Sequence, residues 1–387
     1  MKDITQSLPQ ALLGIVLLFS FVALYIDGEE MGSSRLAAFI LLALPAAFPI
    51  LFRKMDFKLF LKGFKYACGF ALAFLVCILV NLSQYPDAGE IAYNAGLVGS
   101  LFFVMIIASI LVSSNPDFFG KSLSIYAVSG TLFLLYIIAT ETTPGVARQI
   151  PAGIHPNLWG LHAFSIIASA LFIPKRWLRW SIWLVCLYMQ YLVSSRGALL
   201  GGLAIIFMQS FTFLRQRKQV SLTGLILAIF LIVLILSVFL MPQVPFLQSL
   251  HNFIFYDVLQ MDAPNRGLGS GGTGRMEWNI MALKLWAENP VFGIGYGNSI
   301  SVHNGFLLLL AETGIVGLSI FLYLVMRAML NGKSMFSDRY LMGIIGYLAI
   351  LLTYNRGFNV YAPGIIFLFS LWQSLVRPAP PPGEKPG

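Results

Sequence analysis

Long apolar runs, separated by short polar segments, dominate the chain along almost its whole length. A helix of roughly 20 apolar residues is long enough to cross about 30 Å of membrane hydrocarbon. The runs do not alternate polar and apolar residues, as the strands of a membrane β-barrel would. They predict twelve membrane-spanning helices, the tenth broken near residue 314, at residues 11–26, 36–52, 66–82, 92–113, 122–140, 156–173, 177–193, 197–214, 221–241, 303–330, 340–354 and 361–376.

The composition agrees with this pattern. The chain is 58% hydrophobic and only 11% charged, whereas a soluble domain carries about 25% charged residues. Its mean hydropathy is +0.81. We therefore predict an all-α polytopic membrane protein with about twelve transmembrane helices, and we exclude a soluble globular fold.

Basic residues give the chain its net charge of +9, and their distribution predicts its orientation. Eighteen of the 25 lysines and arginines fall in the two termini and the even-numbered connections between predicted spans. Cytoplasmic loops of membrane proteins carry such an excess. We predict that both termini face the cytoplasm and that the odd-numbered connections face outward. The basic charge therefore gives no reason to expect a nucleic-acid partner.

One outer connection is much longer than the others, and it divides the chain. The predicted parts are transmembrane helices 1–9 at residues 1–241, an outer loop at 242–302, transmembrane helices 10–12 at 303–376, and a proline-rich cytoplasmic tail at 377–387. Within the loop, Trp278, Ala282 and Trp286 recur at four-residue spacing. This spacing predicts a helix whose aromatic face lies at the membrane interface, where tryptophan prefers to sit.

Two of the outward arginines stand beside glycine-rich segments. Arg196 lies in "SSRGALLGG" at the outer end of a predicted span, and Arg275 follows "GSGGTG" at the start of the tryptophan-containing helix. Glycines let a backbone approach a ligand closely, a helix N-terminus attracts anions, and arginine grips phosphate oxygens with two donors. Together these features predict a pyrophosphate site at the membrane surface. Contacts to lipid headgroups or to nearby carbonyls are the alternative.

His303 opens the segment "HNGFLLLLAETGIVG" at the point where the outer loop meets a predicted span. Histidine is the side chain best suited to take up a proton near neutral pH. A residue at this place is positioned by a rigid helix and is reachable from outside. We therefore predict that His303 is a catalytic base, and a headgroup contact or a helix cap is the alternative.

Other outward polar residues extend the candidate site. His155 and Asn157 flank Pro156, and proline suits the first turn of a helix, so His155 has a position beside a helix cap as its alternative. In contrast, His162 and His251 are expected to be structural. The further substrate-binding candidates are Arg266, Asn304, His155, Asn157 and Arg356.

The sequence offers no outward D-x-D or H-x-D pair of the kind that holds Mg²⁺ against a sugar diphosphate. Cys68, Cys77 and Cys186 lie within apolar runs and show no metal-ligand spacing. We expect no metal and no cofactor, with arginines neutralising the leaving phosphates. The glycines of "GIGYGNS" lack the strand–turn–helix context of a dinucleotide site, and we interpret them as a flexible approach to His303.

Several of these motifs resemble those of the O-antigen ligase and O-antigen polymerase superfamily. Their order and spacing cover about the second half of the chain, and the first half is similar only as a row of spans. The similar segments are "SSRGALLGG" at 194–202, "GTGRMEWN" at 272–279, "NPVFGIGYG" at 289–297, "HNGFLLLLAETGIVG" at 303–317 and, more weakly, "HPN" at 155–157.

The resemblance implies a GT-C-like membrane glycosyltransferase of the bacterial inner membrane, with its active site facing the periplasm. The donor would be a glycan linked to undecaprenyl diphosphate, and the acceptor would be a sugar of the lipid A-core oligosaccharide. Transfer would invert the anomeric centre without a metal. His303 would assist the acceptor hydroxyl, while Arg196 and Arg275 would hold the diphosphate. Membrane lipids are the other expected partners.

The motifs do not separate a ligase from a polymerase that extends the lipid-linked glycan. We favour a ligase because of the twelve spans, the single dominant outer loop and its "GR…W" segment. More distant alternatives are a teichuronic-acid-type polymerase, a protein O-glycosyltransferase and a transporter of lipid-linked glycans. A transporter places charged residues near the midplane of its spans, whereas here they gather at the predicted outer rim.

Overall fold

The computed structural model describes residues 2–27, 43–47, 49–50, 55–115, 118–142, 150–151, 154, 156–193, 195–216, 273–298, 302, 304–331, 338–351 and 362–376. These residues are helical apart from short connections, and they include no strand. The helices are α1 (Lys2–Asp27), α3 (Phe57–Val80), the short 3₁₀ helix η2 (Leu82–Gln84), α4 (Ala88–Ser114), α5 (Phe118–Glu141), α6 (Pro156–Ala170), α7 (Arg176–Leu192), α8 (Arg196–Gln216), α11 (Thr273–Glu288), α12 (Gly305–Asn331), α13 (Arg339–Leu351) and α14 (Ala362–Val376).

Ten of the twelve predicted spans coincide with a described helix. The predicted span at 221–241 lies outside the described residues, and of the span at 36–52 only 43–47 and 49–50 are described, as helix. Four described helices, α3, α4, α5 and α12, are long and apolar enough to cross a membrane, and several others are shorter and apolar. The chain is an integral membrane protein with several apolar helices. The total of twelve spans stays a prediction.

Two helices begin nine residues before the predicted spans: α1 begins at Lys2 rather than at 11, and α3 also begins early. The apolar run placed the start of the third span at residue 66, but α3 begins at Phe57. Asp56 caps this helix, because its carboxylate accepts hydrogen bonds from the backbone N–H groups of Lys58 and Leu59 at 2.9 and 3.3 Å. The cap extends the helix through a lysine-containing stretch that hydropathy alone excluded.

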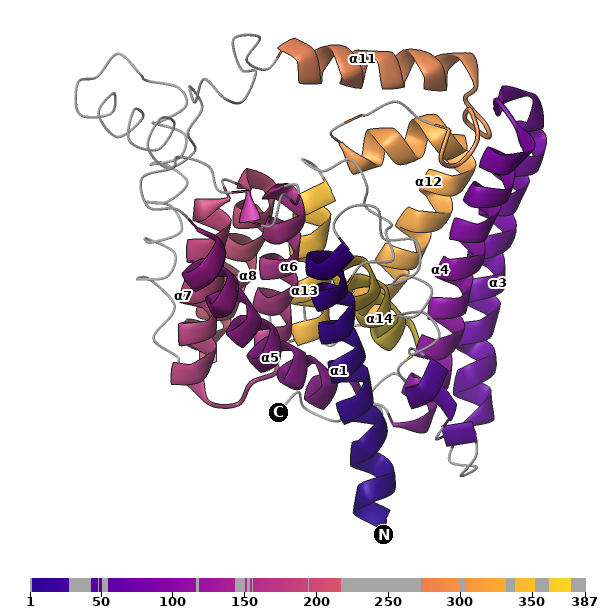
Figure 1. Cartoon of the computed structure of the whole chain (residues 1–387). Coiled ribbons are helices and arrows are strands. Elements are labelled where there is room, and N and C mark those ends of the chain that lie inside the picture. Colours follow the sequence, from indigo (N-terminus) through magenta and orange to yellow (C-terminus); the bar gives the residue numbers. More distant parts are fainter. Residues whose placement is uncertain are drawn as a thin grey trace.

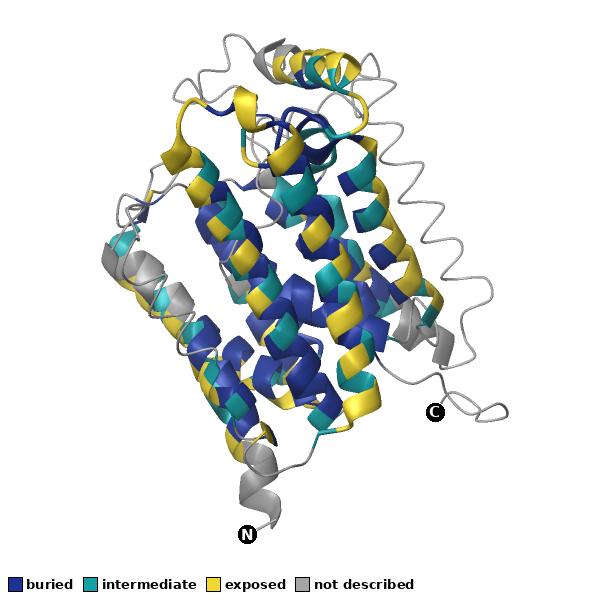
Figure 2. Cartoon of the chain, turned by 90° about the vertical axis from the view of Figure 1, so that its right-hand side faces the viewer, coloured by how far each residue is buried: buried dark blue, intermediate teal, exposed yellow. Residues whose placement is uncertain are grey.

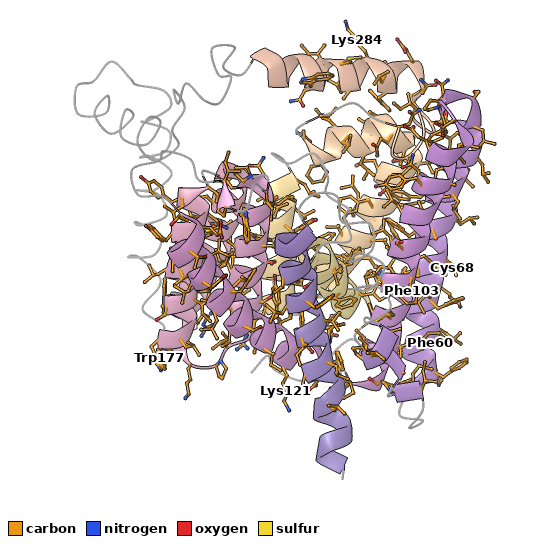
Figure 3. All side chains as sticks on the ribbon, in the orientation of Figure 1. Phe60, Cys68, Phe103, Lys121, Trp177 and Lys284 are labelled. Carbon is orange, nitrogen blue, oxygen red and sulfur yellow. The ribbon has the colours of Figure 1, made fainter. Side chains whose placement is uncertain are left out.

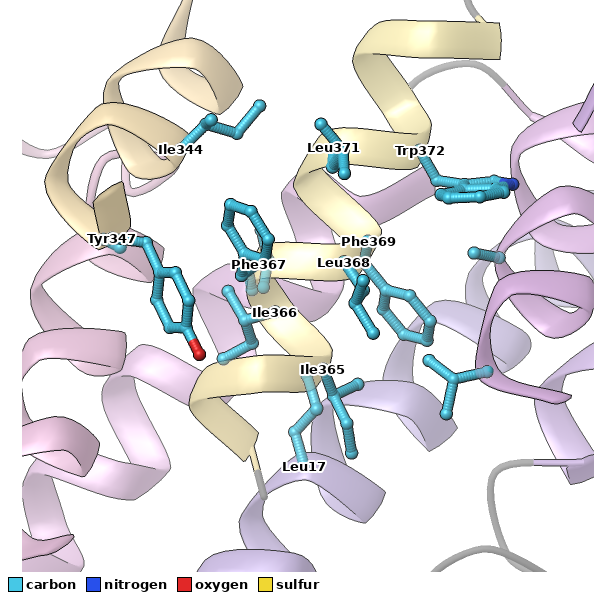
Figure 4. Packing of buried hydrophobic residues seen from close by; sticks show 14 of the residues in the cluster. Leu17, Ile344, Tyr347, Ile365, Ile366, Phe367, Leu368, Phe369, Leu371 and Trp372 are labelled. Atoms are coloured by element: carbon cyan, nitrogen blue, oxygen red, sulfur yellow. The ribbon is translucent and has the colours of Figure 1, made fainter. Parts of the chain in front are cut away.

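α14 lies at the centre of the bundle, and its described side chains from residue 363 to 376 are all buried. Figure 4 shows its aromatic side chains reaching towards different neighbours. Phe367 stacks on Tyr347 of α13 with ring centroids 4.4 Å apart. Trp372 donates its indole N–H to the hydroxyl of Ser109 on α4 at 2.8 Å. This helix therefore joins the α3–α4 pair to the group formed by α6, α8 and α13 (Figure 1).

The outer sides of the peripheral helices are apolar and exposed, as membrane lipid requires. On α3, Leu72 is 65% exposed, while Phe74, two residues further, is fully buried. Figure 2 shows exposed positions along the outer sides of the helices and buried positions between them. A helix with apolar residues all around suits a membrane span rather than a helix at a water-facing surface.

Basic side chains gather at one end of the bundle. Lys121 and Trp177 lie at the lower end in Figure 3, whereas Lys284 of α11 lies at the upper end. The starts of α7 and α13 share this lower end, because Phe172, just before α7, contacts Tyr340 at the start of α13 with ring centroids 4.7 Å apart. The end that collects the basic residues is the end predicted to face the cytoplasm.

This arrangement predicts opposite labelling of two engineered cysteines in a variant whose native cysteines are replaced by alanine. In sealed right-side-out membrane vesicles, Lys284→Cys should react with a membrane-impermeant maleimide, and Lys121→Cys should react only after the vesicles are opened. Both lysines are exposed, so burial does not bias the comparison. Labelling in the reverse order would contradict the predicted orientation.

Candidate functional site

α12 is interrupted at Gly314, as predicted from its glycines. The backbone there adopts φ 61° and ψ −160°, which is not helical. An uninterrupted helix would pair the N–H groups of residues 315 and 316 with the carbonyls of residues 311 and 312. The interruption frees all four groups inside a segment that is otherwise apolar. Each unpaired backbone group in hydrocarbon costs about 2–7 kcal/mol.

The loop after α11 supplies partners for these four groups. Ile315 N–H donates to the Pro290 carbonyl at 2.9 Å, and Val316 N–H donates to the Val291 carbonyl at 3.2 Å. In the other direction, Ile294 N–H and Gly295 N–H donate to the carbonyls of Ala311 and Glu312, each at 2.9 Å. The segment 290–295 is thus inserted into the helix break. We call these four hydrogen bonds the break–loop junction.

Two glycines make this junction possible. Gly293 has φ 66° and Gly314 has φ 61°, a region that side chains other than glycine rarely adopt. A Cβ atom on Gly293 would collide with the backbone of Ala311 and Glu312, and one on Gly314 would collide with the backbone of Val291. The interpretation of this glycine segment as a flexible approach to His303 was wrong, because the glycines instead form a hydrogen-bonded turn.

The α3–α4 connection holds the same loop from the other side. Tyr85 donates its hydroxyl to the Tyr296 carbonyl at 2.8 Å. Asn298 donates its side-chain amide to the Gln84 carbonyl, also at 2.8 Å. Burial, assisted by the nearby charge of Glu312, raises the pKa of Tyr85 well above its ordinary value. Tyr85 therefore keeps its proton and remains a hydrogen-bond donor at any physiological pH.

α11 lies across the first half of α12 at the upper end of the molecule (Figure 1). Ala282 is 1% exposed and packs in a small apolar cluster with Val302 and Ala311, against which Leu307 and Leu308 also pack. The predicted helix is confirmed, and the position of its 278–282–286 face at the membrane interface stays a prediction, with Trp278 39% exposed. The centre of that face packs on protein. Its Trp286 donates the indole N–H to the Pro290 carbonyl at 3.2 Å, which ties α11 to the inserted loop.

Asn304 caps the start of α12. Its side-chain oxygen accepts hydrogen bonds from the backbone N–H groups of Phe306 and Leu307, both at 3.1 Å. Asn304 is therefore the helix cap that was one alternative for His303. His303 itself lies outside the described residues. The residues on either side are described, since Val302 is fully buried and Asn304 is fixed by its cap. A role for Asn304 in substrate binding stays a prediction.

The two predicted diphosphate ligands lie at helix starts. Arg196 is the first residue of α8, and Arg275 lies in the first turn of α11. Their side chains lie outside the described part of the chain, as do the whole residues Arg266, His155 and Arg356.

α6 and α8 also begin next to each other. A Cβ atom on Gly160 of α6 would overlap the side chain of Ser195, the residue before Arg196. Pro156 is the first residue of α6, as predicted, and Asn157 is partly buried in the same turn. Figure 1 places the starts of α6, α8 and α12 and the whole of α11 at one end of the bundle. Helix N-termini carry partial positive charge, so this end favours anions.

The helices thus define a polytopic membrane protein whose candidate site is built at one end around an interrupted helix. Residues 180–322 match the family model of O-antigen ligase, which confirms the resemblance predicted from the motifs. No curated protein matches the sequence. The match indicates an O-antigen ligase or polymerase-like function. It runs from α7 past the break in α12 and includes positions 196, 275 and 303.

Sequence reasoning missed the pairing of the loop 290–295 with α12, which lies within this match, and also residues outside it. Tyr85 and Gln84 come from the α3–α4 connection, where the sequence shows no motif. The spacing of the glycines at 293, 295 and 297 is the sequence signal that could have indicated an unusual backbone conformation in this loop. All three glycines have positive φ.

The junction predicts a large effect of a single methyl group. Gly314→Ala forces a residue with a side chain into a backbone region that is essentially restricted to glycine, which costs about 1–3 kcal/mol, and also drives Cβ into the Val291 carbonyl. We expect the melting temperature of the purified protein to fall by several degrees, or the protein to fail to accumulate. Gly69→Ala is the matched control, because its Cβ would meet nothing within 4 Å on α3. Equal melting temperatures for the two variants would contradict the described junction.

Proposed function

We propose that the protein is an O-antigen ligase that transfers a glycan from undecaprenyl diphosphate to lipid A-core oligosaccharide at the periplasmic face of the bacterial inner membrane. The observation that carries this proposal is the break–loop junction inside the family-matched region. The junction joins the loop after α11 to residues 311–316 of α12, and the apolar cluster around Ala282 holds α11 near Leu307 and Leu308 at the start of α12. Those two elements carry Arg275 and the chain position of His303.

The proposed reaction is a direct displacement with inversion. The acceptor hydroxyl attacks the anomeric carbon on the face opposite the diphosphate, while His303 takes the hydroxyl proton. The bond from the anomeric carbon to the diphosphate oxygen breaks, and its electron pair leaves with the lipid diphosphate. Arg196 and Arg275 neutralise that leaving group, supported by the positive ends of α8 and α11. No metal ligand is required by this scheme.

The polymerase and the transporter are the two alternatives that the arrangement of residues can be compared with. A polymerase would use the same donor site and a second lipid-linked glycan as acceptor, so the site residues do not separate it from a ligase. A transporter would carry charged residues along a path through its spans. Among the described residues, the buried charged side chains are Glu312, beside the break, and Arg179, at the start of α7. That distribution favours an enzyme with a site at one end.

Lipopolysaccharide from a strain lacking the gene tests the proposal. A ligase predicts lipopolysaccharide without O-chains, together with accumulation of long glycans on undecaprenyl diphosphate. Lipopolysaccharide capped with single repeat units would establish the polymerase instead. Unchanged lipopolysaccharide would contradict both.

Complementing the same strain with variants tests the roles of the residues. His303→Ala should lower transfer roughly 10²–10⁴-fold, the usual contribution of general acid–base catalysis, without lowering donor binding. Arg275→Lys keeps the charge but loses the two-pronged donor, so it should weaken donor use, as should Arg196→Ala. Lys284→Gln, an exposed change on the same α11, serves as the control. Full transfer by the His303→Ala protein at normal abundance would remove the histidine from the mechanism.

A further inference from the structure

A buried side-chain amide without a hydrogen-bond partner lies near the start of α4, at the same end of the bundle as the candidate site. Asn94 is 3% exposed, and among the described residues its amide makes no hydrogen bond. It stands two residues inside the predicted span at 92–113, where polar side chains are costly and commonly functional. A buried amide without a partner costs free energy. A bound ligand with hydrogen-bonding groups would remove this cost.

Gly297, in the turn after α11, leaves the Asn94 amide uncovered. A Cβ atom on Gly297 would overlap the oxygen, carbon and nitrogen of that amide. Gly297 is itself exposed. Unlike the amide oxygens of Gln10 and Gln190, which are sealed inside the bundle, the Asn94 amide is not fully enclosed. The missing side chain at 297 therefore keeps the amide within reach of a ligand at the surface.

α4 places two further groups beside this amide. Glu90 is exposed and lies one turn before Asn94 on the same helix face, because residues four apart are neighbours on a helix. Tyr93, three residues after Glu90, is 57% exposed. The loop on the other side is fixed, since Tyr85 donates its hydroxyl to the Tyr296 carbonyl at 2.8 Å. A carboxylate, an amide and an aromatic ring are thus presented together by a rigid helix next to a fixed loop.

These groups suit a neutral ligand that is rich in hydroxyl groups. An amide donates and accepts hydrogen bonds and a carboxylate accepts them, so together they match hydroxyls, which do both. Phosphate is disfavoured by the negative charges of Glu90 and of Asp87, whose carboxylate accepts the Glu90 N–H at 2.8 Å. A metal ion is disfavoured as well, because within the described part of the chain no third histidine, cysteine or carboxylate joins these two. A saccharide has the required chemistry.

The position of this face relative to α11 indicates which part of a glycan it would contact. From position 275 to its end at Glu288, α11 rises about 20 Å. Figure 1 shows the α3–α4 connection beside the end of α11 and not beside its start. Arg275, a proposed ligand of the diphosphate, lies at the start. A sugar bound beside Asn94 is therefore remote from the reacting carbon, and its contact contributes to recognition of the glycan.

We propose that Glu90 and Asn94, together with the uncovered backbone at Gly297, form a saccharide-binding subsite. The assignment of a saccharide rests in part on the proposed transferase function, in which both donor and acceptor carry a glycan. The two glycans share the same hydroxyl chemistry, so the experiment has to separate these sources.

Calorimetric titration of the full-length protein in lipid nanodiscs tests the subsite. The two probes are the core oligosaccharide of the organism's lipopolysaccharide and the glycan released from its undecaprenyl diphosphate lipids, both prepared by mild acid. Binding of the first identifies the acceptor as the source, and binding of the second identifies the donor. Asn94→Leu should raise the dissociation constant about tenfold, the effect of losing one or two neutral hydrogen bonds. Glu90→Gln should weaken binding as well, whereas Glu288→Gln, an exposed carboxylate on α11, is the matched control and should not.

Melting temperatures separate this role from a structural one. Replacing an unpaired amide by an apolar side chain of similar shape is close to neutral or stabilising. Asn94→Leu should therefore melt no lower than the wild type while it binds less saccharide. If it does melt lower, the exposed-site variant Glu90→Gln decides.

Two results would overturn the subsite. One is that the wild type binds neither saccharide, and the other is that both variants bind as tightly as the wild type. Lipopolysaccharide from the deletion strain reports transfer independently of these titrations. A protein that attaches O-chains but fails the titrations would therefore lose the subsite and keep the proposed function.

Discussion

The break–loop junction is the interaction on which the outer end of the molecule depends. A membrane helix satisfies its own backbone, so an interruption is tolerated only where another segment takes over the freed groups. Here the segment 290–295 provides two acceptors and two donors to residues 311, 312, 315 and 316. Because all four freed backbone groups gain hydrogen-bond partners, the first half of α12 can run in a different direction from the second half. No backbone group at the break is then exposed to lipid. That redirection gives the candidate site its support.

The junction also connects parts of the chain that lie far apart in sequence. α11 contacts the inserted loop through Trp286, and the α3–α4 connection contacts the end of that loop through Tyr85 and Gln84. The family match covers residues 180–322 only, yet the loop within it is held by residues from the first half. The positions of α11 and α12 therefore depend on contacts from both halves of the chain, although only the second half carries recognisable motifs.

Sequence reasoning predicted the helices well where hydrophobicity alone determines them. The apolar runs located most spans, and the glycine at 314 indicated the interruption of α12. The start of α3 was missed because the Asp56 cap carries its helix beyond the apolar run. The 278–282–286 spacing predicted the helix but not the packing of Ala282 on protein, because periodicity identifies a buried face without identifying what buries it. The inserted loop was missed for a similar reason, since pairing between distant backbone groups leaves no periodic pattern. His303 and the side chains of Arg196 and Arg275 remain predictions from sequence.

Amide hydrogen exchange at the junction tests this account most directly. The N–H groups of Ile294, Gly295, Ile315 and Val316 would be followed in the full-length protein in lipid nanodiscs, with the interior of α4 as reference. The account predicts that all four exchange as slowly as helix-interior amides, although Ile294 and Gly295 lie in a glycine-rich turn. Exchange of these two amides as fast as in an exposed turn would show that the loop does not occupy the break, and would contradict the account.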